Sequence, residues 1–354
     1  FEKQCEYMMK HPEIDVVVEV MGGVEPAFTF VKKALDAGKS VCTSNKALVA
    51  AHGPELLEMA KERKLNFMFE ASVGGGIPII RPLNQSLTAD EITKITGILN
   101  GTTNYILTKM SKEGSSYEET LKEAQELGYA ERNPEADVEG YDACRKIAIL
   151  TSLAYGSTVN LEEVTTEGIS KISTADFKYA EKLGCVVKLL ATSYRRDEKV
   201  YVITAPFMID STHPLYNVND VLNGIYVNGN VLGNVMFFGA GAGKLPTASA
   251  VVADVVDCVK HKGTNVMTVW AKTKLELGKT DDEVREFFVR INGDASKDAD
   301  AVKAAFGDVS VITVDGIEGE FGFVTGEMTE KAFNEAAKKF SVINRIRIDK
   351  TILK

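Results

Sequence analysis

The stretch DVVVEVM, residues 15–21, decides the fold of the first part of the chain. After Asp15 it is apolar except for Glu19, and it ends at Gly22 and Gly23. A short apolar run that ends in glycine is typical of a parallel strand covered on both faces. Pro26 then stands where the first turn of a helix tolerates proline, and Gly38 marks the end of that helix. The segment predicts a strand followed by a helix.

The same alternation continues beyond this unit. A second strand is expected over SVCTSN, residues 40–45, a helix from about Lys46 to Arg63, and a third strand over KLNFMFE, residues 64–70. Strands that alternate with helices favour an α/β, doubly wound sheet of the Rossmann type. In such a sheet, ligands lie at the carboxyl ends of the strands. We therefore expect residues 1–69 to form part of a dinucleotide-binding domain.

The rest of the chain divides by composition into two further units. A glycine-rich turn opens an α+β domain expected over residues 70–235, and a glycine loop with an apolar helix, residues 236–265, is expected to return to the first domain. Residues 279–354 then show the order strand, helix, strand, strand, helix, strand. This order within about 75 residues is typical of a small split-βαβ domain.

Composition excludes several classes of protein. The 354 residues are 45% hydrophobic, enough for two or three cores. We expect no membrane span, because no segment approaches the roughly 20 apolar residues that one needs. The net charge of -9 argues against a nucleic-acid partner. Five scattered cysteines favour reduced thiols in a cytoplasm, and four dispersed histidines give little basis for a zinc site or a serine triad.

The densest group of reactive side chains contains Glu131, Asp137, Asp142 and Lys146. Glycine and proline residues within 128–140 place the first two on a loop. Asp142 and Lys146 are spaced i,i+4 and share a helix face, where a surface salt bridge is the alternative to a reactive pair. Spacing alone leaves both interpretations open.

Six blocks of sequence together resemble homoserine dehydrogenase in order and spacing, over about residues 10–265. The blocks are EVMGG (19–23), TSNKALVA (43–50), EASVGGGIPII (70–80), GILNGTTNYIL (97–107), LGYAERNPEADVEGYDACRKIAIL (127–150) and GAGAGKLPTASAVVAD (239–254). The resemblance implies a cytoplasmic enzyme that reduces L-aspartate 4-semialdehyde to L-homoserine with NADP or NAD, in threonine, methionine and isoleucine biosynthesis. It also implies that residues 70–235 bind substrate and form a dimer.

The resemblance assigns roles to particular residues. Reduction of an aldehyde needs a proton for the forming alkoxide and positive charge near its oxygen, and lysine supplies both. Lys146 and Lys46 are marked as catalytic, with Asp142 orienting a lysine or a water; we expect burial or a second cation to lower the lysine pKa. The implied substrate-binding residues are Gly101, Thr102, Tyr129, Glu131, Asp137, Asp142 and Lys146.

Two loops are expected to hold the cofactor and a cation. The implied cofactor-binding residues are Gly22, Gly23, Thr43, Ser44, Asn45, Lys46, Gly241 and Gly243. The implied ligands of a sodium-like cation are Glu70, Val73, Gly75 and Ile77, although a plain turn is the alternative. The G-x-G-x-x-G fingerprint and the residue that selects NAD or NADP are expected in a segment of about 60 residues before Phe1.

The terminal unit is similar to an ACT domain, an amino-acid-sensing module. Its loop 292–298 is where an effector such as threonine is expected to bind, commonly at a dimer interface, and dimerisation alone is the alternative. We expect a homodimer or homotetramer. Two rival functions remain: a thiohemiacetal-forming dehydrogenase, for which Cys144 lies on a different helix face from Asp142 and Lys146, and a non-catalytic amino-acid sensor.

Overall fold

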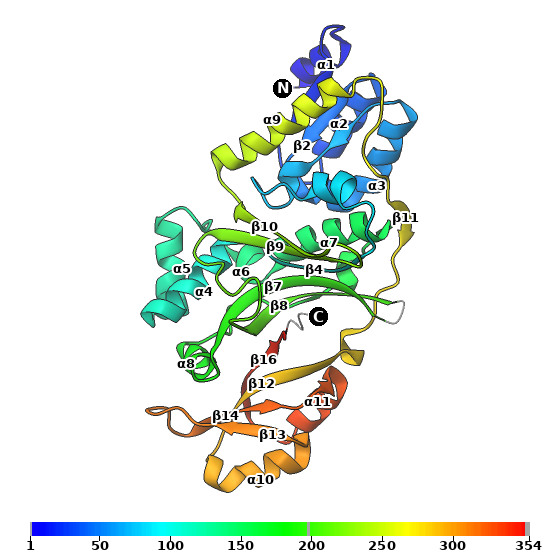
Figure 1. Ribbon diagram of the computed structural model, residues 1–354. Coiled ribbons are helices and arrows are strands. Elements are labelled where there is room, and N and C mark those ends of the chain that lie inside the picture. Colours follow the sequence, from blue (N-terminus) through cyan, green and yellow to red (C-terminus); the bar gives the residue numbers. More distant parts are fainter. Residues whose placement is uncertain (1, 197–198, 351–354) are drawn as a thin grey trace.

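The computed structural model describes residues 2–196 and 199–350. The molecule is elongated, with three parts stacked along its length (Figure 1). The N-terminal α/β domain lies at one end, a large sheet with helices lies in the middle, and a smaller α/β unit lies at the other end. No described helix is long and apolar enough to cross a bilayer.

The first domain contains the predicted alternation of strands and helices. Its three strands are parallel in the order β1-β2-β3, and the third is only two residues long because the chain turns into a short 3-10 helix at Glu70. The expected strand over residues 64–70 was therefore too long. The elements are α1 (Glu2–Lys10), β1 (Val16–Glu19), α2 (Ala27–Asp36), β2 (Ser40–Thr43), α3 (Lys46–Glu62) and β3 (Phe67–Met68).

A helix from much later in the chain completes this domain. The helix α9 (Lys244–Lys260) packs on β1 and β2, and the sulfur atoms of Cys258 and Cys42 lie 3.6 Å apart. The chain thus returns to the first domain. However, residues 236–240 lie in the last strand of the middle sheet, so the return begins near Gly241 rather than at residue 236.

The middle part is a sheet of long antiparallel strands with helices against it. The strand order is β10-β9-β4-β7-β8, and α7 packs on β4, β7 and β8 while also contacting α3 of the first domain. The strands are β4 (Ile92–Ile98), β7 (Cys185–Arg196), β8 (Lys199–Asp210), β9 (Leu222–Gly229) and β10 (Gly233–Ala240). The helices are α4 (Gly101–Glu113), α5 (Tyr117–Glu126), α6 (Glu135–Val138), α7 (Tyr141–Tyr155) and α8 (Thr174–Lys182).

The terminal part has the predicted order of elements, with one added two-residue strand. It contains β12 (Val284–Asn292), α10 (Ala295–Phe306), β13 (Val309–Ile312), β14 (Glu320–Thr325), β15 (Met328–Thr329), α11 (Glu330–Ala337) and β16 (Val342–Ile348). Its four main strands are antiparallel in the order β16-β12-β14-β13. The last strand also pairs in parallel with β8, through Arg347 opposite Phe207 and Ile348 opposite Met208. One sheet therefore runs through both parts.

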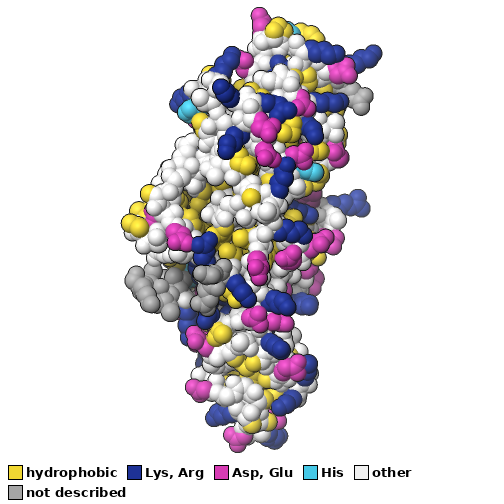
Figure 2. Space-filling view, turned by 90° about the vertical axis from the view of Figure 1, so that its right-hand side faces the viewer, with side chains coloured by type: hydrophobic (Ala, Val, Ile, Leu, Met, Phe, Trp, Pro, Cys, Tyr) yellow, Lys and Arg dark blue, Asp and Glu magenta, His cyan; other side chains and the backbone are white. Residues whose placement is uncertain are grey.

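The surface reflects this division. In Figure 2, charged side chains cover the two ends of the molecule, and apolar side chains gather over part of the middle. The edge strand β10 alternates between less and more exposed residues, and Met236 and Phe238 on it are exposed. The middle sheet thus leaves an apolar edge uncovered in the chain.

Candidate active site

A buried carboxylate between two lysines forms the centre of the site. Gly140, with φ of 81°, starts α7, so Asp142 lies in its first turn and Lys146 one turn later on the same face. The Oδ2 atom of Asp142 lies 2.7 Å from Nζ of Lys146, and its Oδ1 atom lies 2.8 Å from Nζ of Lys46. Lys46 is the first residue of α3, so this carboxylate joins the first domain to the middle part.

Burial decides between a surface salt bridge and a built site. Asp142 is 4% exposed and Lys146 is 9% exposed. Burial alone would raise the pKa of Asp142, but the charges of Lys146 and Lys46 outweigh it and hold that pKa well below its usual range. Asp142 is therefore a fixed negative charge that orients both ammonium groups and screens their repulsion.

Asn100 connects the end of β4 to this cluster, and sequence reasoning did not single it out. Its Oδ1 atom caps α4 by accepting from the N–H of Thr103, while its Nδ2 atom donates to Asp142 Oδ2 at 2.9 Å and to Asp137 Oδ1 at 2.8 Å. The preceding carbonyl, of Leu99, accepts from Nζ of Lys146 at 2.7 Å. An asparagine before a helix is an N-cap signal, but its second role depends on the tertiary structure.

The other predicted substrate residues fall into two groups. Asp137 lies in the one-turn helix α6 rather than on a loop, because Pro134 begins that turn. Burial raises the pKa of Asp137, against the lowering effect of its hydrogen bond from Asn100. Glu131 is exposed on the loop before α6, and its carboxylate has no partner among residues 2–196 and 199–350. The structure thus brings Asp137 into the cluster and leaves Glu131 outside it.

Gly101 and Thr102 lie beside the cluster at the start of α4, and Tyr129 lies next to them in the loop between α5 and α6. Thr102 donates its hydroxyl hydrogen to the carbonyl of Tyr129 at 2.6 Å. The ring of Tyr129 meets Tyr105 edge-on at a centroid distance of 5.0 Å, yet the side chain is 44% exposed. The start of α4 is therefore tied to the loop before α6, next to Asn100.

The predicted cofactor residues surround the carboxyl ends of β1 and β2. Gly22 and Gly23 have φ of 79° and 73°, and the carbonyl of Gly23 accepts from Asn45 Nδ2 at 2.6 Å. Asn45 also caps α3, whose first residue is Lys46. The loop after β1 is thus fixed to the helix that carries a lysine of the central cluster.

A cavity of about 480 Å³ lies next to this loop, lined by Val20 just after β1, Ser44 just after β2, and residues at the start of α9 that include Gly243 and Thr247. Gly243 precedes α9 and has no side chain that could cap it. The N-terminal N–H groups of a helix without a cap favour an anion. Gly241 does not line this cavity; it packs between Gly75 and Asn223.

The predicted cation loop contains a buried carboxylate. Glu70 is 3% exposed, and its two oxygens accept hydrogen bonds from the N–H groups of Ile79, Ile80 and Arg81. It thus fastens the ends of the loop together. No group of three or more His, Cys, Asp and Glu side chains in the described chain is arranged to bind a metal ion.

The oxygens of the same loop that remain free are those of the main chain. Within the described part of the protein, the carbonyls of Val73, Gly75 and Ile77 accept no hydrogen bond. A Cβ atom on Gly75 would lie 2.4 Å from the carbonyl oxygen of Gly241, so only glycine fits there. Free carbonyls beside a buried carboxylate are the donors that a hard cation takes.

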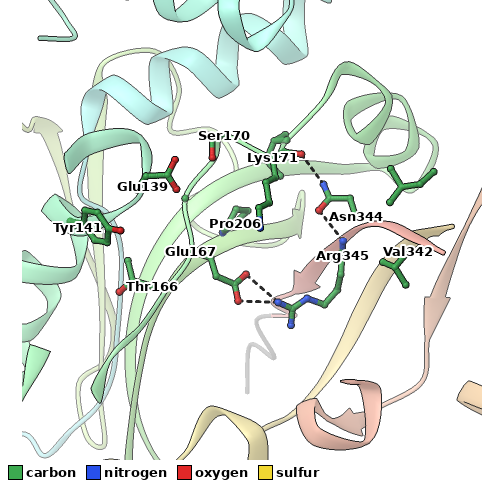
Figure 3. Close-up of a pocket in the computed structure, with 13 residues that line it drawn as sticks. Glu139, Tyr141, Thr166, Glu167, Ser170, Lys171, Pro206, Val342, Asn344 and Arg345 are labelled. Carbon is green, nitrogen blue, oxygen red and sulfur yellow. Dashed lines mark hydrogen bonds and ion pairs between the residues drawn. The ribbon is translucent and has the colours of Figure 1, made fainter. Parts of the chain in front are cut away.

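A second cavity lies between the middle and terminal parts. It measures about 460 Å³ and is lined by Glu139 and Tyr141 at the start of α7, the segment 166–172, Pro206 and β16. Figure 3 shows the carboxylate of Glu167 facing the guanidinium of Arg345 across this junction, at 2.9 Å. Because Tyr141 precedes Asp142, the cavity joins β16 to the helix that carries the central carboxylate.

Comparisons with known proteins agree with this architecture. The family model "Homoserine dehydrogenase" matches residues 78–256, and "Homoserine dehydrogenase, NAD binding domain" matches residues 1–70. Homoserine dehydrogenase of Synechocystis is 50% identical over 258 residues, which cover 72% of this chain and 60% of the relative. That of Bacillus subtilis is 49% identical over 250 residues, which cover 71% and 58%. The matched region spans about three-fifths of the length of these curated relatives.

Solved structures extend the likeness to the terminal part. The crystal structure of a homoserine dehydrogenase from Thiobacillus denitrificans has a TM-score of 0.88 and 35% identity, covering 97% of this chain and 84% of that one. A Staphylococcus aureus homoserine dehydrogenase has a TM-score of 0.81 at 32% identity, covering 98% and 84%. A hyperthermophilic archaeal homoserine dehydrogenase in complex with NADPH has a TM-score of 0.61 at 34% identity, covering 69% and 71%. This chain belongs to the homoserine dehydrogenase family.

Proposed function

We propose that the chain catalyses the reduction of L-aspartate 4-semialdehyde to L-homoserine with NADPH or NADH. The observation that carries the proposal is the buried carboxylate of Asp142 between Lys146 and Lys46, at the junction of the cofactor-side domain and the middle part. The nicotinamide, when bound, supplies a hydride. The protein must then donate a proton and stabilise negative charge on the aldehyde oxygen.

Lys146 is the better placed proton donor. An ammonium group has three hydrogens. Two have acceptors here, in Asp142 and the carbonyl of Leu99, which leaves one for the aldehyde oxygen. Lys46, whose side chain is 41% exposed, comes from the other domain and adds positive charge from that side. Lys146 is held by two hydrogen bonds and suits proton donation, whereas the more exposed Lys46 can adjust its position and supplies charge.

The direct test is an assay of the full-length protein with L-aspartate 4-semialdehyde, following NADPH oxidation. A second measurement, fluorescence titration with NADPH, separates this proposal from a non-catalytic amino-acid sensor. The enzyme must bind the cofactor and turn over, whereas a sensor does neither. Binding to Gly22, Gly23 and residues 43–46 is supported by their position at the carboxyl ends of β1 and β2, and binding to the glycine loop is supported by Gly243, which lines the cavity beside them.

The substrate's ammonium group is expected to bind acidic side chains beside the cluster. Asp137→Asn should raise the KM for the aldehyde by roughly 10- to 100-fold, because a charged hydrogen bond is lost. Glu131→Gln should have a smaller effect, since Glu131 is exposed in this structure. Steady-state kinetics with both variants checks this, and the dissociation constant of NADPH should remain unchanged. A loss of cofactor affinity equal to the loss of substrate affinity would place these acids in the wrong site.

We also propose that the loop 70–77 holds a sodium ion. The support is the set of free carbonyls at Val73, Gly75 and Ile77 beside the carboxylate of Glu70. The ion would brace the loop against Gly241 and so act on the cofactor loop indirectly. Thermal unfolding in sodium chloride and in tetramethylammonium chloride tests this. Equal melting temperatures at equal ionic strength would contradict the sodium site.

A homodimer or homotetramer is proposed for the assembly. The support is β10, an edge strand whose Met236 and Phe238 are exposed. Apolar side chains in a row on a sheet edge are typical of a contact surface. Sedimentation equilibrium tests the proposal, and a monomer at micromolar concentration would contradict it.

We propose that the terminal part couples an amino-acid effector such as threonine to activity. Two places in this part are candidate sites for the effector. In the loop 292–298, Asp294 and Asp298 already bond to the loop itself. The junction cavity instead has Lys171, whose ammonium group has no partner among the described residues.

The expected coupling is about 5- to 150-fold in affinity, the usual scale for allosteric coupling. Calorimetry and inhibition assays with threonine on the full-length protein measure it. Lys171→Ala should weaken the effect if the junction cavity is the site. Lys297→Ala, in the loop, is the comparison variant, since Lys297 is also exposed but is paired with Asp294. If calorimetry shows no heat of binding with threonine, methionine, isoleucine or lysine, the sensing proposal is contradicted and dimerisation is left as the role of this part.

A further inference from the structure

A buried asparagine without partners lies at the meeting point of the two proposed sites. Asn223 is the second residue of β9 and is 1% exposed. Neither its Oδ1 nor its Nδ2 atom has a hydrogen-bond partner in the described chain. Folded proteins rarely keep a buried amide unpaired, because its desolvation is then uncompensated. Such a side chain needs an explanation.

Its position connects substrate and cofactor residues. A Cβ atom on Gly241 would lie 2.1 Å from the amide carbon of Asn223, and one on Gly101 would lie 3.5 Å from its Oδ1 atom. Gly101 follows Asn100, which bonds to Asp137 and Asp142. The amide therefore lies between the start of α4 and the glycine loop that precedes α9.

A second buried asparagine shows that the region can satisfy such a side chain. Asn104, on α4, is also 1% exposed. Its Nδ2 atom donates to the carbonyls of Val218, Asp220 and Leu222, and its Oδ1 atom accepts from Nζ of Lys188. The unpaired state of Asn223 is thus particular to its place.

The neighbouring helix end has free donors as well. The Oδ1 atom of Asn100 accepts from the N–H of Thr103, and the N–H groups of Gly101 and Thr102 have no acceptor among residues that the structure describes. Free N–H groups at a helix start attract a carboxylate. With the amide of Asn223 beside them, the donors and the acceptor match the carboxylate and ammonium groups of one amino acid.

We propose that Asn223 is a substrate-binding residue that holds the amino-acid end of the substrate. Its Nδ2 atom donates to the substrate's α-carboxylate, together with the N–H groups of Gly101 and Thr102, and its Oδ1 atom accepts from the ammonium group. The loop around Gly241 covers the amide and must shift as substrate binds; glycine makes that shift easy. This inference rests on the proposed reduction of an amino-acid aldehyde.

The test compares Asn223→Ala with Asn104→Ala in the full-length protein. For Asn223→Ala we expect KM for L-aspartate 4-semialdehyde to rise roughly 10- to 100-fold, as for a lost hydrogen bond to a charged group. Its melting temperature should fall less than that of Asn104→Ala, because the amide that is removed loses packing but no hydrogen bond. For Asn104→Ala we expect a lower melting temperature and an unchanged KM.

The opposite pattern would overturn the proposal. Asn223 would be structural if its alanine variant melted earlier and kept its KM, and it would belong to the cofactor site if the dissociation constant of NADPH rose instead. Should the alanine variant fail to fold, Asn223→Ser gives the same comparison with a smaller change. A wild-type protein that does not reduce the aldehyde would refute the proposed function itself, whereas an active wild type with a normal Asn223→Ala KM refutes only this assignment.

Discussion

Replacing Lys146 by alanine is expected to lower kcat by roughly 10²- to 10⁴-fold while the protein remains folded. The ammonium group lies 2.7 Å from both Asp142 and the carbonyl of Leu99, so it is held in place before substrate binds. The variant loses the proton donor and one of two positive charges beside the aldehyde oxygen. Because these act mainly in the transition state, kcat should fall more than substrate affinity. Lys46→Ala and Asp142→Asn should also lower kcat by orders of magnitude.

Two further variants separate chemistry from stability. Lys146→Arg keeps a positive charge but is a very poor proton donor, so its kcat should remain low if proton transfer is the main loss. Lys188 is the matched control, since it is a buried lysine bonded to Asn104 and Val218 away from the cluster. Lys188→Ala should lower the melting temperature and leave kcat close to the wild-type value. A wild-type kcat in Lys146→Ala would remove this lysine from the catalytic assignment.

The sequence predicted the elements well where a local pattern specifies them. Residues 16–19 of the run 15–21 form β1, and the alternating elements after residue 279 follow the expected order, because burial and turn residues leave a signal within a few positions. The pairing of β16 with β8 leaves no such signal, because it depends on how two parts of the chain dock. The sequence therefore predicted two separate units over residues 70–235 and 279–354, whereas one sheet runs through both.

The residues of the candidate site also differ in how far the sequence alone predicts them. The i,i+4 spacing placed Asp142 and Lys146 on one face, as the structure shows. The contact between Asp142 and Lys46 spans two domains, and only resemblance to a family suggested that both act together. Asn100 and Asn223 could not be singled out, because their importance lies in partners gained or missing in three dimensions.

The junction between the middle and terminal parts contains a buried ion network. Arg347 is 1% exposed; its Nε atom donates to Glu330, and its two terminal nitrogens donate to Glu167 at 2.8 Å. Burial would raise the pKa of Glu167, but Arg347 and Arg345 outweigh it and lower that pKa to about 2. The network therefore joins segment 166–172 to the last strand and to α11 by charge as well as by backbone pairing.

Arg347→Met is expected to reduce the free energy of unfolding by at most about 3–5 kcal/mol at pH 7, because it leaves the buried carboxylate of Glu330 and the half-buried carboxylate of Glu167 with Arg345 as their remaining partner. Chemical denaturation measures the loss. Arg345→Met is the matched control: Arg345 binds the same two glutamates, but its side chain is 18% exposed, so its loss should be smaller. Equal stability of wild type and Arg347→Met would show that the network does not hold the junction.

The same network gives a pH dependence whose sign is fixed. The pKa of Glu167 is lower in the folded state than its ordinary value of 4.5, so the stability that this carboxylate contributes is present above about pH 4.5 and is lost as the pH falls toward 2. The difference between wild type and Arg347→Met should therefore shrink over this range. A difference that stays constant from pH 7 to pH 3 would assign the loss to packing of the arginine side chain. Because removal of residues 279 onward would strip Arg347 from Glu167 and uncover β8, point variants at this junction test regulation more cleanly than truncation does.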